Sequence, residues 1–337
     1  MIEVAVFGAG RIGSIHAGNL AAVPGVRLAY VVDPNAEAAG TLAARLGAQV
    51  STAEQVFGDD RISAVLICSL TDTHADLIQA AAKSDKHIFC EKPVDLDVAR
   101  ARDCAAAVAR AGVTCMIGFN RRFDPTFAAV KARLNGGEIG TPEMLIVTSR
   151  DPGPPPIPYI KSSGGIFKDM LIHDLDVFRW ILEEEAETVY ASASCLVDPA
   201  IARAGDVDST AVTLRTRSGK LCQINTSRRA AYGYDQRFEV LGSAGMLQAG
   251  NHTPTEVISS TAKAVSRDLP ENFFLQRYRA AYASEMQHFF AVLTGKKAPA
   301  TTIDDGVKAL ELAEAATTSW REGRIVSMQE SPKARPV

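Results

Sequence analysis

The stretch IEVAVFGAGRIGSIHAGNLAAVPGVRLAYVVDPN, residues 2–35, decides the fold. A short apolar run leads into Gly8, Gly10 and Gly13, which form a G-x-G-x-x-G pattern. A helical segment and a second apolar run follow, and the second run ends at Asp33. Glycines placed between a strand and a helix, with an acid about 20 residues later, are typical of a dinucleotide-binding βαβ unit.

Each glycine of this turn has its own physical reason. Gly8 permits the tight turn, Gly10 lets the backbone approach a pyrophosphate, and Gly13 lets the helix pack closely on the strand. Arg11 and Ile12 open the helix, whose N-terminus would hold the pyrophosphate because free N–H groups and the helix dipole favour anions. The pattern therefore predicts a site for a dinucleotide cofactor.

Asp33 predicts which dinucleotide is bound. A carboxylate at the end of the second strand accepts hydrogen bonds from ribose hydroxyls and repels a 2′-phosphate. No arginine follows it in the sequence DPN. We therefore expect NAD to be preferred over NADP.

Strands and helices continue to alternate as far as residue 124, which predicts a doubly wound parallel sheet. Ligands bind beyond the carboxyl ends of the strands in such sheets. His74 opens a helix, and a packing or capping role is the more common one for such a histidine. The predicted strands are residues 2–7, 26–32, 62–69, 86–93 and 113–124, and the predicted helices are residues 12–22, 73–84 and 97–112. The polar residues at strand ends that we expect near the ligands are Ser69, Thr71, His74, Glu91, Lys92, Asn120 and Arg121.

The pattern changes after residue 121, which predicts a second domain. Neighbouring strands without intervening helices indicate a mostly antiparallel sheet. The predicted fold is thus α/β, with a Rossmann domain (1–121), an α+β domain containing a large open sheet (122–330) and a frayed tail (331–337). The second domain is predicted to contain helices 125–134, 276–293 and 302–322, strands 142–150, 187–197, 208–216, 220–230 and 236–243, and a proline-rich loop, 151–165.

The segment GGIFKDMLIHDLDVFRW, residues 164–180, is predicted to be a helix with two distinct faces. At 100° per residue, Leu171, Leu175, Phe178 and Leu182 form an apolar stripe that can dock on a core. The opposite side carries Asp169, His173, Asp176 and Trp180. That side is either a solvated polar face or one that faces a site, and Trp180 argues against full solvation because fully wet faces seldom carry an indole.

Bulk properties exclude several classes of protein. The formal net charge of -3 gives no sign of binding to nucleic acid or to an anionic membrane surface. No apolar run approaches the length of a membrane span, and the N-terminal residues lack a secretion signal. The six cysteines form no CxxC pair and no zinc-like spacing with histidines. We therefore expect a cytoplasmic protein without a metal.

These motifs together resemble the Gfo/Idh/MocA oxidoreductase family, and the resemblance covers nearly the whole chain. It rests on the terminal G-x-G-x-x-G, EKP at 91–93, GFNRRFD at 118–124, and Asp169 with His173 four residues later. The segments around the proline-rich loop and AYGYDQRFEVLGS, residues 231–243, are most similar to members that oxidise inositol. The resemblance implies NAD(P)-linked oxidation of a polyol or sugar, commonly by a homotetramer, with Lys92, Asp169 and His173 as the catalytic group.

The chemistry of these side chains fits the oxidation of a secondary alcohol. A neutral imidazole suits removal of the hydroxyl proton, which gives His173 the role of general base. Asp169 can orient the ring and stabilise the imidazolium, and Lys92 can polarise the developing alkoxide. The candidates for binding the other hydroxyls, each with a structural role as the alternative, are Asn120, Arg121, Asp151, Asp176, Tyr232, Tyr234 and Gln236.

The expected reaction is oxidation of myo-inositol to 2-keto-myo-inositol, with tetramers formed through the sheet of the second domain. Alternatives within the family are a dehydrogenase for another inositol isomer, a monosaccharide or an anhydrosugar. A glycosidase that retains NAD and a non-catalytic dinucleotide sensor also remain open. The presence of all of Lys92, Asp169 and His173 argues against the sensor.

Overall fold

The computed structural model describes residues 1–328, and these form two compact units by their contacts. One unit contains residues 1–124 and 279–310, and the other contains residues 125–278 and those from 311 onward. The predicted frayed tail, residues 331–337, lies outside the described residues. The predicted domain boundary after residue 121 stays a prediction.

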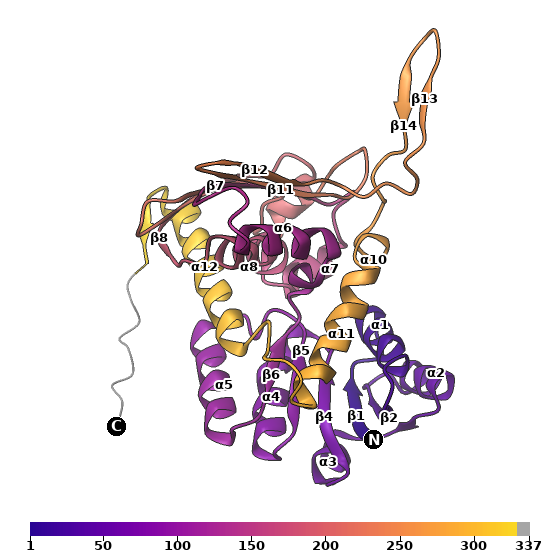
Figure 1. Cartoon of the computed structure of the whole chain (residues 1–337). Coiled ribbons are helices and arrows are strands. Elements are labelled where there is room, and N and C mark those ends of the chain that lie inside the picture. Colours follow the sequence, from indigo (N-terminus) through magenta and orange to yellow (C-terminus); the bar gives the residue numbers. More distant parts are fainter. Residues whose placement is uncertain (329–337) are drawn as a thin grey trace. The chain divides into compact units, whose positions relative to one another are not determined.

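The first unit is built on a six-stranded parallel sheet, as predicted (Figure 1). Its strand order is β3-β2-β1-β4-β5-β6 and every neighbouring pair is parallel, which is the arrangement of a dinucleotide-binding doubly wound sheet. The inner strands are buried almost throughout because helices cover both faces of such a sheet. The strands are β1 (Ile2–Phe7), β2 (Val26–Val32), β3 (Gln49–Val50), β4 (Ile62–Ile67), β5 (His87–Cys90) and β6 (Cys115–Ile117).

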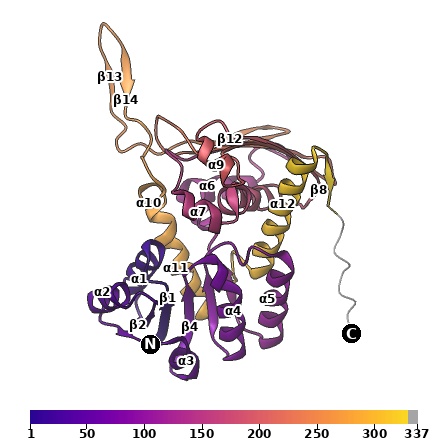
Figure 2. The ribbon, with the colours of Figure 1, turned by 180° about the vertical axis from the view of Figure 1, so that it is seen from behind.

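Capping residues mark both ends of α2. Asn35 caps α2 by accepting hydrogen bonds from the backbone N–H groups of Glu37 and Ala38, and Gly47 ends it in the left-handed conformation. The helix α11 belongs to the same unit and packs on α1, as Figure 1 and Figure 2 show from opposite sides. The helices are α1 (Arg11–Ala21), α2 (Ala36–Leu46), α3 (Ala53–Gly58), α4 (His74–Lys83), α5 (Val98–Ala111) and α11 (Arg279–Leu293), with 3₁₀ turns at Thr71–Thr73 and Asn120–Phe123.

The second unit carries a seven-stranded sheet in the order β12-β11-β7-β10-β9-β8-β15. Only β7 and β10 pair in parallel, so the predicted mostly antiparallel sheet is confirmed. Buried and exposed residues alternate along β9, so one face of the sheet packs on the core. The strands are β7 (Pro142–Arg150), β8 (Ala186–Ser194), β9 (Ser209–Thr216), β10 (Leu221–Ser227), β11 (Asp235–Gly242), β12 (Gly245–Ala249) and β15 (Val326–Ser327).

The helices of the second unit correct several predictions. The loop 151–165 contains a short helix, and the predicted helix 276–293 is broken at Tyr278 into α10 and α11. A hairpin of β13 (Ile258–Ser260) and β14 (Val265–Arg267), which the sequence did not indicate, extends away from the sheet (Figure 1, Figure 2). The helices are α6 (Pro125–Asn135), α7 (Ile157–Ser162), α8 (Ile172–Leu182), α9 (Pro199–Arg203), α10 (Phe274–Arg277) and α12 (Ile303–Glu322). The first turns of α12, as far as residue 310, belong to the first unit.

Candidate active site

The glycine turn has the geometry that its three positions predict. Gly8 has φ +99°, and a Cβ there would lie 2.5 Å from the carbonyl oxygen of Cys68. A Cβ on Gly13 would lie 1.8 Å from the carbonyl oxygen of Gly8, so only glycine lets α1 approach β1 this closely. A Cβ on Gly10 would meet no atom within 4 Å. The turn is therefore packed tightly against the protein at Gly8 and Gly13, whereas Gly10 has open space beside it. That space fits an approaching pyrophosphate.

The N-terminus of α1 is suited to an anion. Its N-cap is Gly10, which offers no side chain to the first N–H groups, and its first turn carries no acidic residue. These N–H groups and the positive end of the helix dipole favour a phosphate. Arg11 is exposed and Ile12 is partly buried at this end.

Asp33 is held in place at the end of β2 by two backbone groups. Its Oδ2 accepts a hydrogen bond from the N–H of Ala9 at 2.7 Å, and its Oδ1 accepts one from Asn35 at 2.8 Å. Each carboxylate oxygen has a second lone pair, so ribose hydroxyls can still be bound. The acid thus fixes the glycine turn as well as being available to a ligand. A hollow of about 320 Å³ beside this turn is lined by Ala9, Ser14, Asn35, Glu37, Ala38, Thr41, Leu42 and Arg45.

His74 contacts the segments that follow β4 and β5. It is buried, with Nδ1 2.8 Å from the carbonyl oxygen of Pro93 and Nε2 3.2 Å from that of Ser69. Burial lowers the pKa of His74, so the ring is neutral and donates to one of these oxygens. These contacts fit the packing role better than direct contact with the cofactor. Ser69 Oγ in turn pairs with the hydroxyl of Thr73 at 2.6 Å, and Thr71 opens the 3₁₀ turn between them.

The other predicted residues of the first unit lie at the ends of β5 and β6. Lys92 follows Glu91 directly, and its peptide bond to Pro93 is cis. Asn120 and Arg121 are both buried in the 3₁₀ turn that follows β6. Lys92 and Glu91 are partly buried.

In the second unit, the helix that carries Asp169 and His173 is not uniform. Residues Phe167–Leu171 form a π-helical turn, and α8 begins only at Ile172. The predicted stripe of Leu171, Leu175, Phe178 and Leu182 is buried as expected. The predicted helix assumed a constant rotation of 100° per residue, and this is wrong across the π turn. A π turn contains about one more residue than an α-helical turn, so Asp169 and the residues after the turn do not keep α-helical register. The opposite side is also not a solvated face, since Asp176 is fully buried.

Asp169 is held by two residues that sequence reasoning missed. The hydroxyl of Tyr159, on α7, donates to Oδ1 of Asp169 at 2.9 Å. The guanidinium of Arg228, just after β10, lies 3.3 Å from Oδ2. Burial and then the charge of Asp169 raise the pKa of Tyr159, which keeps the phenol protonated as the donor. No spacing rule connects residue 169 with residues 159 and 228, so only the structure could show this.

Arg228 also faces a second carboxylate. Its side chain is 1% exposed, and it acts electrostatically on Asp206. Asp206 accepts hydrogen bonds from the N–H of Ile166, at 3.1 and 3.2 Å, directly before the π turn. Burial raises the pKa of Asp206, against the effect of these N–H groups and of Arg228. The arginine therefore stabilises both Asp169 and the start of the segment that carries it.

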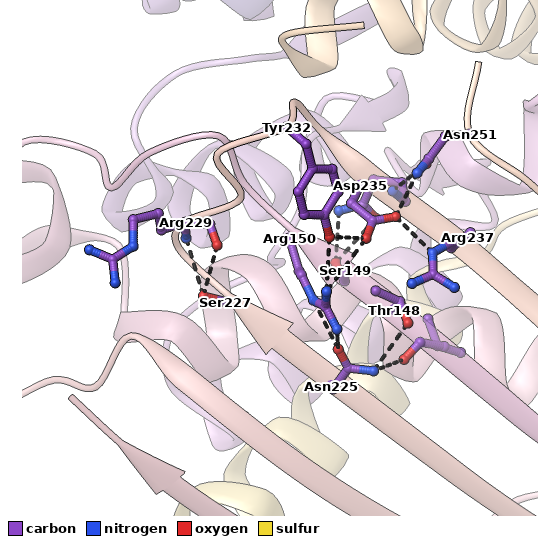
Figure 3. A network of polar contacts seen from close by, with 12 residues as sticks. Thr148, Ser149, Arg150, Asn225, Ser227, Arg229, Tyr232, Asp235, Arg237 and Asn251 are labelled. Atoms are coloured by element: carbon purple, nitrogen blue, oxygen red, sulfur yellow. Dashed lines mark hydrogen bonds and ion pairs between the residues drawn. The ribbon is translucent and has the colours of Figure 1, made fainter. Parts of the chain in front are cut away.

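A polar network joins the ends of β7, β10 and β11 (Figure 3). Arg150 binds the side-chain oxygen of Asn225 through two nitrogens, at 2.8 and 3.2 Å, and donates to the hydroxyl of Tyr232. The same hydroxyl donates to Asp235 at 2.6 Å, and Asp235 also accepts from Asn251 and Arg237. These hydrogen bonds lower the pKa of Asp235 against the effect of its burial. Tyr232 is thus already hydrogen-bonded within the protein.

The remaining substrate candidates differ in their surroundings. Asp151 is partly buried, and its N–H donates to the carbonyl oxygen of Ser227. Tyr234 is 7% exposed and packs edge to face on Tyr278. Gln236 is buried and hydrogen-bonded to Ser149. Their roles in binding substrate stay predictions, and Asp151 is the most accessible of the three.

Two further findings bear on the class of protein. Within residues 1–328, no three His, Cys, Asp or Glu side chains are grouped so that they could hold a metal ion. Across the same residues, no helix combines the length and the apolar character needed to cross a membrane.

Comparison with known proteins agrees with the fold and the cofactor turn. Residues 2–119 match the model of an oxidoreductase family NAD-binding Rossmann fold, GFO_IDH_MocA. Residues 131–328 match the model of the C-terminal alpha/beta domain of the same family. The N-terminal part is therefore an NAD-binding domain, as the glycine turn and Asp33 predicted.

Individual relatives extend over nearly the whole chain. The inositol 2-dehydrogenase of Rhizobium meliloti (strain 1021) is 46% identical over 97% of this chain and 99% of its own. The myo-inositol 2-dehydrogenase of Thermotoga maritima is 42% identical over 98% and 99%. The solved structure of a scyllo-inositol dehydrogenase from Lactobacillus casei, with bound NAD(H) and scyllo-inositol, superposes with a TM-score of 0.90 at 27% identity, covering 97% of this chain and 99% of that one.

These matches, the Rossmann sheet with its glycine turn, and the helix carrying Asp169 and His173 lead to one assignment. The chain is an oxidoreductase similar to inositol 2-dehydrogenases, and it belongs to the Gfo/Idh/MocA family.

Proposed function

We propose that the protein oxidises myo-inositol at its 2-hydroxyl to 2-keto-myo-inositol with NAD as the oxidant. The observation that carries the proposal is the placement of Asp169, which Tyr159 and Arg228 hold one turn before His173 in the second unit. The identity with relatives named as inositol and myo-inositol 2-dehydrogenases supports this choice of substrate.

The residues divide the chemistry between them. Oxidation removes the hydroxyl proton and a hydride from the same carbon, and bound NAD supplies the acceptor for that hydride. His173 takes the hydroxyl proton as general base. Asp169 orients the imidazole and stabilises its protonated form, as an acid beside a catalytic histidine does. Lys92 stabilises the negative charge that develops on the oxygen.

The substrate is tested by a panel. NAD reduction is measured with myo-, scyllo- and chiro-inositol and with glucose, and we expect the highest kcat/KM for myo-inositol. A preference for scyllo-inositol, which the Lactobacillus casei relative binds, would keep the enzyme class and change the isomer. Efficient turnover of glucose, or no NADH from any polyol, would contradict the proposal.

We also propose that the protein is a homotetramer assembled through the seven-stranded sheet. The face of this sheet that points away from the core exposes Tyr190, Leu241 and Met246. Large exposed apolar side chains on one sheet face suit a subunit interface. Light scattering during size-exclusion chromatography should give four times the chain mass of 36.0 kDa, and a monomer would contradict the proposal.

The proposed location is the cytoplasm. All six cysteines are free, and Cys90, Cys104, Cys115 and Cys222 are buried. Buried unpaired thiols suit a reducing compartment. Fractionation of the source cells with an antibody against the protein would test this.

A further inference from the structure

The hollow beside the glycine turn lies between α1 and α2, two neighbouring helices of the first unit (Figure 1), and it borders on Asp33. The backbone groups that hold the Asp33 carboxylate belong to Ala9 and Asn35, at 2.7 and 2.8 Å. Both of these residues also line the hollow of about 320 Å³. The acid that is placed for the ribose hydroxyls therefore stands at the edge of a space large enough for a further group.

Arg45, in the last turn of α2, is the basic side chain among the described residues that line this hollow. Its Nη2 donates a hydrogen bond to the carbonyl oxygen of Ser14 at 3.3 Å. The hydroxyl of Ser14 in turn donates to the carbonyl oxygen of Ala9 at 3.4 Å. The guanidinium is thus held against the start of α1, next to the glycine turn. A guanidinium has five N–H donors, so one bond to a carbonyl oxygen leaves donors for a ligand.

The opposite end of the hollow is acidic. Glu37 is an exposed residue in the first turn of α2, and it lines the hollow near the carboxylate of Asp33. The N–H groups of Glu37 and Ala38 already donate to the side chain of Asn35, at 3.1 Å each, so they are not available to an anion. An anion in the hollow would therefore be attracted by Arg45 and repelled by Asp33 and Glu37.

The anion that this arrangement fits is part of a dinucleotide. NADP differs from NAD by a phosphate on the 2′-oxygen of the ribose whose hydroxyls an acid such as Asp33 binds, and an arginine close by accommodates that phosphate in proteins that use NADP. No arginine follows Asp33 directly in the sequence. Arg45, one helix later, nevertheless reaches the space beside this acid.

We propose that the hollow between α1 and α2 is a latent site for the 2′-phosphate of NADP, in which Arg45 binds the phosphate while Asp33 and Glu37 oppose it. Arg45 and Glu37 are thus further determinants of cofactor choice, in addition to Asp33. They set how strongly NAD is preferred, whichever polyol is oxidised.

The test measures the dissociation constants of NADP and NAD by isothermal titration calorimetry. The full-length protein is used at low ionic strength, where contributions from exposed charges are largest. Arg45→Met and Glu37→Gln are each combined with Asp33→Ser, which removes the first opposing carboxylate. The matched control is Arg110→Met in the same background, because Arg110 is also an exposed arginine in the last turn of a helix, α5, and does not line the hollow.

We expect Arg45→Met to weaken binding of NADP about fivefold or more, the scale of a charge-assisted contact at an exposed site, and Glu37→Gln to strengthen it about threefold. The affinity for NAD should not change in either variant, because NAD carries no phosphate on this oxygen. Arg110→Met should change neither constant. The same two substitutions in the protein that keeps Asp33 should shift the affinity for NADP in the same directions, which preserves the test if Asp33→Ser does not fold.

The inference is overturned if Arg45→Met leaves the affinity for NADP unchanged, or if it weakens NAD to the same extent, since that would indicate a damaged glycine turn. An Asp33→Ser protein that binds NAD and shows no binding of NADP would overturn it as well. Calorimetry needs no polyol, so the result is independent of the proposed substrate and of the catalytic roles assigned in the second unit.

Discussion

At the scale of single residues, Asp33 and Arg228 each have two roles in the candidate site. Asp33 holds the glycine turn through Ala9 while standing where a ribose would bind. Arg228 pairs with Asp169 and acts on Asp206, so it supports both an acid and the segment that carries it. The sequence predicted the ribose-binding role of Asp33 from its distance to the glycines, and it did not predict the contact with Ala9. It could not predict Arg228, because that contact joins residues 59 positions apart.

The preference for NAD depends on the charge of Asp33. We expect Asp33→Ser to lower the ratio of kcat/KM for NAD over that for NADP by about 10- to 100-fold, since it removes charge-assisted hydrogen bonds and the repulsion of a 2′-phosphate. Steady-state kinetics with both cofactors measures this. Asp60→Ser, which removes an exposed acid elsewhere in the same unit, is the control. An unchanged ratio in the Asp33 variant would remove this residue from cofactor selection.

Arg228 offers a matched pair of variants. Arg228→Met leaves Asp169 without its cation and should destabilise the protein by about 3 kcal/mol, the usual cost of breaking a buried ion pair. It should also reduce kcat, because the Asp169 carboxylate is no longer fixed. Arg229→Met removes an exposed arginine, which Figure 3 shows apart from the network around Arg150, and should change neither quantity. Urea denaturation and initial rates measure both effects, and equal behaviour of the two variants would refute the role of Arg228.

At the scale of elements, periodicity predicted the regular parts well. The buried strands β1 and β4 were predicted from short, nearly continuous apolar runs, and the apolar stripe of α8 was predicted from a period of 3.6 residues. The π turn was not predicted, since its backbone depends on packing and not on a side-chain pattern. The helix α7 was not predicted, because the prolines around it indicated a loop. A proline in the first turn of a helix is nevertheless well tolerated.

The start of the π turn depends on Gly165. Its φ is +76°, and a Cβ would lie 2.7 Å from Oδ1 of Asp206. We therefore expect Gly165→Ala to lower the free energy of unfolding by about 1–3 kcal/mol through backbone strain and displacement of that carboxylate. Gly153→Ala, where a Cβ meets nothing within 4 Å, is the matched control in urea denaturation. If both alanine variants unfold alike, Gly165 is not required at this position.

At the scale of the whole molecule, the sequence predicted the two architectures and their order along the chain. It did not predict that residues 279–310 pack with residues 1–124, because a helix pattern does not say which core the helix joins. The resemblance to a family identified Lys92, Asp169 and His173 as a group. Their surroundings, such as the contacts of Asp169 with Tyr159 and Arg228, came only from the structure.

The buried acid Glu285 should make the stability of the whole protein depend on pH. Its pKa is raised in the folded state, so the folded protein binds more protons than the unfolded chain above the ordinary glutamate value of 4.5. The stability that this group contributes is complete below that value and is lost as pH rises towards the folded pKa, with a slope of at most about 1.4 kcal/mol per pH unit.

Glu285→Gln removes this titration. The difference in unfolding free energy between the variant and the unmodified protein should therefore grow in favour of the variant as pH is raised from about 5 to 8. Urea denaturation at several pH values measures the difference. A constant difference across this range would mean that Glu285 has the same proton affinity in the folded and unfolded states.

The central claim is that His173 takes the hydroxyl proton when a polyol is oxidised, and one comparison tests it most directly. NADH formation from myo-inositol is measured for the unmodified protein and for His173→Ala, with NAD affinity determined on the same samples. The account predicts a loss of turnover of about 10²-fold or more, the usual scale for a positioned base, with NAD affinity unchanged because the glycine turn and Asp33 are intact. A folded His173→Ala protein that binds NAD and turns over myo-inositol at a near-normal rate would contradict it.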